Sequence, residues 1–150
     1  MISPQRTQGS AEKNLDAITG IIIDAAMKVH SALGPGLLES AYEACLKYEL
    51  SKRSLVVESQ VVLPVFYNGV KIEAGYRIDL LVENEIILEL KAVDKVIPIH
   101  EAQLLSYLKL SGKQVGLLLN FNVLHLKDGI TRVVNAYRRS PRPSASSAVS

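Results

Sequence analysis

The chain has 150 residues, 48% of them hydrophobic and 21% charged, with a formal net charge of +2. This composition suits one compact domain and excludes wholesale disorder. No apolar run approaches the length of a bilayer span, so we expect no membrane partner. A single cysteine, Cys45, excludes an internal disulfide and favours a reducing, cytoplasmic location. The small positive charge permits an anionic partner without requiring one.

We expect a single domain over residues 14–137, with a tail on each side of it. Residues 1–13 are polar and weakly patterned, and residues 138–150 are rich in Ser, Pro and Arg without an apolar period. Such a composition predicts a disordered C-terminal tail. Its arginines could contact a phosphate backbone, but the favoured explanation for them is a solubilising tail: Arg138, Arg139 and Arg142.

Two helices are predicted at the start of the domain. Over residues 15–33 apolar side chains recur every three or four positions, which is the period of an amphipathic helix. Gly34-Pro35-Gly36 ends that helix. A second helix is predicted over residues 37–52, with an apolar side that includes Leu46 and Leu50.

Strands and one more helix follow. Residues 56–66, 70–82 and 86–92 are strand-like, and Asn68-Gly69 predicts a tight turn between the first two. A helix over residues 100–110 should end at Gly112, before a buried strand over residues 115–120. Short strands over 123–126 and 130–134 would flank a turn at Asp128-Gly129. The order α-α-β-β-β-α-β predicts an α/β (α+β) domain, with a mixed β-sheet flanked by helices.

Three ionisable residues form the most informative pattern. Glu89 and Lys91 are two apart on a predicted strand, so their side chains share a face. Asp79 lies on the strand before and would join them if the two strands pair. Buried charges are costly unless they are paired or bind a metal, so a catalytic site around Mg²⁺ is the leading explanation.

The loop between these strands sets a geometric condition. A two-residue loop at Glu83-Asn84 would place Asp79 opposite Leu88, and Glu89 would face the other side of the sheet. A three-residue loop with Asn84 in the left-handed conformation, or a bulge, would place Asp79 opposite Glu89. We therefore predict the longer loop or a bulge if the two acids act together.

Several motifs together resemble a known family. The segment Gly36-Leu37-Leu38-Glu39-Ser40-Ala41-Tyr42 is similar to the signature of the GxxExxY proteins, which are assigned to the PD-(D/E)xK nuclease-like superfamily. The likeness covers roughly residues 16–135 and continues through residues 76–81, 89–91, 103–108 and 117–121. It implies a restriction-endonuclease-like core, whose helix, three strands, helix and strand match the order above.

The resemblance also implies a set of site residues. Asp79 and Glu89 would be the metal-binding carboxylates, with Glu39 as the acid on the first core helix that completes such sites. Lys91 would orient or deprotonate the attacking water and offset charge at the scissile phosphate. Gln103 and Tyr107 match a Gln-x-x-x-Tyr element close to the metal site or the substrate strand. The implied cofactor is Mg²⁺, with Mn²⁺ as a substitute, because two carboxylates, waters and a phosphate satisfy such an ion. The implied partner is nucleic acid, above all DNA, and many such cores form homodimers.

Plainer explanations remain open for each residue. The acids and lysine could form a structural ion-pair network, Glu39 could serve only the helix dipole, and Tyr42 suits core packing. Gln103 and Tyr107 could be the polar edge of an amphipathic helix. Two functions therefore stay in view: a Mg²⁺-dependent nuclease that hydrolyses phosphodiester bonds with an activated water, and a non-catalytic module that binds nucleic acid or protein.

Overall fold

A computed structural model describes residues 8–136, with side chains from residue 14 onward. Two helices come first, α1 (Gln8–Leu33) and α2 (Glu39–Lys52). Helix α1 begins seven residues before the predicted start at residue 15, so residues 8–13 of the predicted tail are helical. Residues 1–7 and 137–150 lie outside the described part, and the prediction for Arg138, Arg139 and Arg142 lies there with them.

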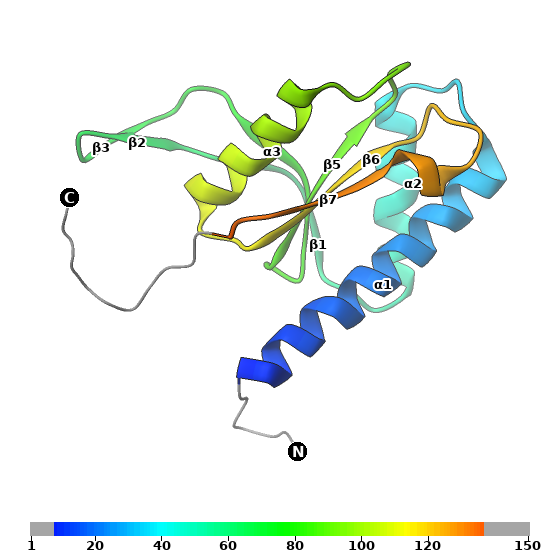
Figure 1. Cartoon of the computed structure of the whole chain (residues 1–150), viewed down its shortest axis with the longest axis horizontal. Helices are drawn as coiled ribbons and strands as arrows, with labels where there is room; N and C mark the ends of the chain where they lie inside the picture. The colour runs from blue at the N-terminus through cyan, green and yellow to red at the C-terminus, as the bar shows by residue number, and fades with distance from the viewer. Residues whose placement is uncertain (1–7, 137–150) are drawn as a thin grey trace.

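A five-stranded mixed sheet forms the centre of the molecule (Figure 1). Its strands lie in the order β1 (Val57–Val62), β4 (Arg77–Val82), β5 (Ile86–Lys91), β6 (Val115–Asn120) and β7 (Ile130–Val134). Strands β5 and β6 are parallel, and the other neighbours are antiparallel. A parallel pair needs a crossover, which α3 (Pro98–Ser111) supplies. The helix ends at Gly112, as predicted, and this glycine has the left-handed conformation. The predicted mixed α+β fold is confirmed.

Helices cover both faces of this sheet (Figure 1). Helices α1 and α2 pack on one face, where Ile22, Val29, Tyr42 and Leu46 contact the apolar side chains of β4, β5 and β6. Helix α3 packs on the other face through Leu104, Tyr107 and Leu108. Strand β6 is buried along its whole length, which explains its continuous apolar sequence.

The two long strands predicted over residues 56–66 and 70–82 are each broken. Leu63 donates its N–H to the carbonyl of Tyr76 at 3.0 Å, and Pro64 has no N–H to continue the ladder. On the other side Gly75 has a φ of +84°, which a continuous strand does not allow. The segments beyond these breaks form a separate hairpin, β2 (Val65–Tyr67) and β3 (Val70–Ile72). Its predicted Asn68-Gly69 turn is confirmed, and Figure 1 shows the hairpin reaching out beyond the sheet.

The strand predicted over residues 123–126 is wrong. A 3₁₀ turn, η1 (Leu126–Gly129), precedes β7 instead. A Cβ on Gly129 would overlap the carbonyl oxygen of Asn120, so the turn passes directly over the end of β6. The ring nitrogen Nε2 of His30 donates to the carbonyl of Val123 at 2.8 Å and ties this loop to α1. A loop and a 3₁₀ turn packed closely over β6 therefore take the place of the expected strand.

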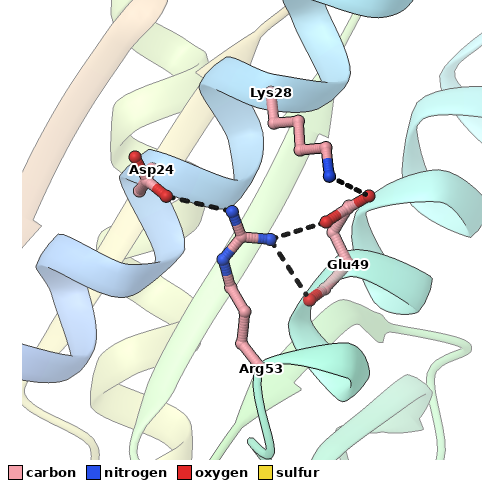
Figure 2. Close-up of polar contacts among 4 residues, drawn as sticks. All are labelled: Asp24, Lys28, Glu49 and Arg53. Atoms are coloured by element: carbon pink, nitrogen blue, oxygen red, sulfur yellow. Dashed lines mark hydrogen bonds and ion pairs between the residues drawn. The ribbon is translucent and has the colours of Figure 1, made fainter.

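An ionic cluster joins α1 to α2 (Figure 2). The Arg53 guanidinium donates to Glu49 at 2.6 Å and to Asp24 at 2.9 Å, and Lys28 lies 3.6 Å from the other oxygen of Glu49. Burial opposes ionisation of Glu49, but the hydrogen bond from Arg53 and the charge of Lys28 hold its pKa below the ordinary value. Every charge in this cluster has a partner, and the cluster fixes the helix that carries Glu39.

Among residues 8–136, no helix combines the length and the apolar character needed to cross a membrane.

Candidate active site at the open end of the β4–β5 hairpin

The loop between β4 and β5 has the three residues that the paired acids require. Glu83 and Asn84 have φ values of 53° and 54°, and the Glu85 N–H donates to the Val82 carbonyl at 2.9 Å. The prediction of a longer loop with a left-handed Asn84 is confirmed. The resulting register is Val82 opposite Ile86, Leu81 opposite Ile87 and Leu80 opposite Leu88. One step further along this register, Asp79 and Glu89 face each other.

The carboxylates of Asp79 and Glu89 replace the backbone ladder at this point. Regular pairing ends at Leu80 and Leu88. Beyond it, the Asp79 N–H donates to Glu89 Oε2 at 3.1 Å, and the Leu90 N–H donates to Asp79 Oδ2 at 2.9 Å. Each carboxylate is thus held by the backbone of the opposite strand. Each carboxylate also has a second oxygen, which makes no hydrogen bond within the described residues.

Both carboxyl groups resist ionisation. Burial raises the pKa of Glu89 to about 8, with a further contribution from the charge of Asp79. Burial also raises the pKa of Asp79, against the hydrogen bond from Leu90, and the charges of Glu43 and Glu39 add to the increase. A cation bound between the two carboxylates would offset the repulsion between their negative charges.

The positive charge of Lys91 lowers the pKa of both acids without reversing either shift. Its carbonyl accepts from the Phe121 N–H at 2.9 Å, so its backbone extends the pairing with β6. The next turn is held by buried Asn120, whose side chain bonds both the N–H and the carbonyl of Val93 at 3.1 and 2.9 Å. Within the described residues, the Lys91 ammonium forms no ion pair.

Helix α2 brings two acids toward this pair, and the sequence predicted only one of them. Glu39 is exposed in the first turn, and its charge raises the pKa of both Asp79 and Glu89. Glu43, one turn later, has a larger effect on Asp79 than Glu39 has. Its position four residues after Glu39 was the signal that could have found it, because such residues share a helix face.

Gln60 holds Glu43 in place from a distorted point in β1. The Gln60 amide donates to both oxygens of Glu43 at 3.2 and 3.1 Å. In register Gln60 is opposite Asp79, but it is left out of the pairing and has a φ of 53°. A left-handed glutamine inside a strand is strained, and such strain tends to occur at functional sites. No pattern in the sequence pointed to Gln60.

Tyr42 is a core residue that supports the start of α2. Its ring is fully buried and stacks on Phe121, with centroids 4.5 Å apart and planes 13° apart. Its hydroxyl donates to the Gly34 carbonyl at 2.6 Å and accepts from the Leu37 N–H at 3.0 Å. The expected core role for Tyr42 is confirmed. Through the Gly34-Pro35-Gly36 turn, it also sets where Glu39 begins the helix.

Gln103 and Tyr107 lie together on α3, as one turn of helix requires, with Gln103 Nε2 donating to the Tyr107 hydroxyl at 3.3 Å. Burial raises the pKa of Tyr107, and the charges of Glu89, Tyr76 and Asp79 add to the rise. Tyr107 therefore lies within the electrostatic reach of both acids. Of the six residues predicted for the site, only Glu39 is strongly exposed, at the helix start.

The donor set suits a hard divalent cation that keeps part of its water shell. Two partly enclosed carboxylates supply oxygen ligands, which Mg²⁺ and Mn²⁺ prefer. In the described residues, no three His, Cys, Asp or Glu side chains are close enough together to hold a metal by themselves. Asp79 and Glu89 could therefore contribute two ligands, with waters and a substrate phosphate as the others.

Comparison with known protein families gives one match. Residues 16–133 match the family model described as the PD-(D/E)XK nuclease superfamily. Searches of curated proteins and of solved structures found no match.

Proposed function

Because the chain belongs to the PD-(D/E)XK nuclease superfamily, we propose that it hydrolyses phosphodiester bonds in DNA with the help of a bound Mg²⁺ ion. Nucleases of this superfamily generally use divalent metal ions and act on nucleic acid. The observation that carries the proposal is the pair formed by half-buried Asp79 and buried Glu89, two carboxyl groups fixed face to face with raised pKa values.

Each residue has a role in this mechanism. Asp79 and Glu89 would hold the cation, and Glu39 would complete its surroundings through water. When bound, the ion would polarise the phosphoryl oxygen and lower the pKa of the attacking water. Lys91, whose ammonium has no ion-pair partner among the described residues, would orient that water and offset the negative charge that develops on the phosphate. Gln103 and Tyr107 would position the substrate strand beside the acids.

The test is a cleavage assay on supercoiled, linear and single-stranded DNA with Mg²⁺ or Mn²⁺. We expect Asp79→Asn and Glu89→Gln to abolish cleavage and Lys91→Met to lower its rate by about 10²–10³-fold, as for loss of one stabiliser of developing charge. Glu58→Gln, which changes an exposed acid on β1, is the matched control and should cleave normally. Cleavage that persists in Asp79→Asn would contradict the assignment.

The finer features belong to the same proposal. We propose the GxxExxY subfamily from its signature over residues 36–42, and a cytoplasmic location from the lone Cys45. A non-catalytic binding module is the alternative, and it predicts DNA binding without any dependence on Asp79 or on a divalent ion. A homodimer and the single-domain boundaries at residues 14 and 137 remain predictions.

A further inference from the structure

A groove of about 510 Å³ lies between α3 and the base of the β2–β3 hairpin, next to the candidate active site. Val65 and Tyr76 line it on one side, and Ile99, Gln103 and Tyr107 line it on the other. Gln103 and Tyr107 belong to the predicted site, and the charges of Glu89 and Asp79 act on Tyr107, so the groove lies beside the acid pair. We propose that this groove is a nucleobase subsite, which holds an unpaired base of the strand that is cleaved.

The groove offers flat aromatic surface at its opening. The rings of Tyr76 and Tyr107 have centroids 5.9 Å apart and planes tilted by 59°. The Tyr76 side chain is 42% exposed, whereas Tyr107 is 6% exposed and forms the deeper wall. Ile99 is 64% exposed and extends the apolar surface on α3. A base can stack on such a surface whatever its identity, and this is how many single-strand-binding proteins hold their ligands.

The polar groups of the groove suit a base more than a phosphate. No lysine, arginine, aspartate or glutamate is among the described residues that line it; its other polar side chains are Ser106 and His100, whose Nδ1 already accepts from the Ile97 N–H at 3.1 Å. The amide of Gln103 and the hydroxyl of Tyr107, 3.3 Å apart, can hydrogen-bond to the edge of a base. Arg77, which follows Tyr76 in the chain, is an exposed cation beside the groove, and its guanidinium donates to the Tyr76 carbonyl at 3.5 Å. The phosphate of a stacked nucleotide would therefore meet Arg77 on the strand that carries Asp79.

Charge favours an unpaired strand over a duplex. Duplex binders rely on many contacts between cationic side chains and phosphates, and this chain has a net charge of only +2. Within a duplex, the faces of each base are covered by its neighbours. A groove that binds through aromatic faces reaches a base only where the strand is single or the base is unstacked.

The inference rests on the proposed nuclease function, but a binding experiment in EDTA tests it without cleavage. Fluorescence anisotropy would compare a labelled oligothymidylate with a duplex of the same length, and a 2-aminopurine base would report stacking. We expect tighter binding of the single strand, with 2-aminopurine quenching. Tyr76→Ala should weaken the binding on the order of tenfold and remove the quenching, whereas Tyr76→Phe should keep both. Tyr48→Ala, which removes another exposed tyrosine on α2, is the matched control.

Three results would overturn the subsite: duplex binding as tight as single-strand binding, unchanged affinity and quenching in Tyr76→Ala, or a homodimer that Tyr76→Ala dissociates. A homodimer that Tyr76→Ala dissociates would mean that the groove binds a second copy of the chain. Failure of the proposed nuclease function would give a different result, namely no cleavage by the parent protein while Tyr76-dependent binding persists. An oligouridylate bound equally well would support the subsite and extend it to RNA.

Discussion

At the scale of single residues, the central feature is that Glu89 is an acid buried against another acid. Its pKa of about 8 lies well above the value of 4.5 expected in an unfolded chain. Between these two values the folded state binds more protons than the unfolded state. The contribution of Glu89 to stability is therefore fully present below pH 4.5 and is lost as the pH rises toward 8.

This gives a pH dependence of opposite sign to that of an ordinary ion-paired carboxylate. Without divalent ions, we expect the free energy of unfolding to fall as the pH rises from about 4.5 to about 8, by up to about 1.4 kcal/mol per unit. Glu89→Gln should remove this contribution and be more stable than the parent at pH 8. Urea denaturation at several pH values measures both curves. If the free energy of unfolding changed with pH in the same way in the parent and in Glu89→Gln, the raised pKa of Glu89 would be contradicted.

Tyr42 provides a second test at this scale. Tyr42→Phe keeps the ring stacked on Phe121 but leaves the Gly34 carbonyl and the Leu37 N–H without their partner. A hydrogen bond contributes about 0.5–1.5 kcal/mol to stability, and since these two are only partly buried, we expect Tyr42→Phe to lose about 1–2 kcal/mol in urea denaturation. Tyr48→Phe, at an exposed position on the same helix, should change stability by less than about 0.5 kcal/mol. Equal midpoints for the two variants would mean that the turn does not depend on the Tyr42 hydroxyl.

At the scale of elements, the loop after β4 sets the register on which the acid pair depends. Asn84 has a φ of 54°, which a β-branched residue adopts only at a cost. We expect Asn84→Val to lower the free energy of unfolding by about 1–2 kcal/mol and Asn84→Gly to change it little. Thermal or urea unfolding measures the difference. Equal stability of the valine and glycine variants would argue against the left-handed loop.

The sequence predicted elements well where local signals agreed, and failed where distant packing decided. The β4–β5 loop followed from the requirement that Asp79 and Glu89 share a face. The breaks at Pro64 and Gly75 do not follow from the local pattern, because the β-branched residues around them favour continuous strands. The 3₁₀ turn before β7 depends on Gly129 passing over the end of β6, a contact between segments that no local pattern reports.

The candidate site shows the same division. Asp79, Glu89 and Lys91 could be found because strand pairing converts their spacing into proximity. Gln60 could not, since its role comes from a left-handed backbone opposite Asp79 and from its bond to Glu43. Glu43 could have been predicted from the sequence, because it lies one helical turn after Glu39. The groove formed by Tyr76 and α3 required the β2–β3 hairpin, which the sequence had merged into longer strands.

At the scale of the whole molecule, two ionic clusters differ in how their charges are balanced. The cluster of Asp24, Lys28, Glu49 and Arg53 is neutral in sum and joins two helices (Figure 2). The cluster around Asp79 and Glu89 has more acids than bases, and it lies where the sheet opens between α2 and α3. The first stabilises the fold, and the second has an excess of negative charge that a cation can neutralise.

The most direct test of the nuclease site is a calorimetric titration of the full chain with Mn²⁺ at neutral pH, repeated on Asp79→Asn. We predict that the parent binds the ion, with protons released as Glu89 ionises, and that Asp79→Asn does not bind it. Absence of binding to the parent at millimolar Mn²⁺, or equal binding to both proteins, would contradict a metal-dependent site at Asp79 and Glu89.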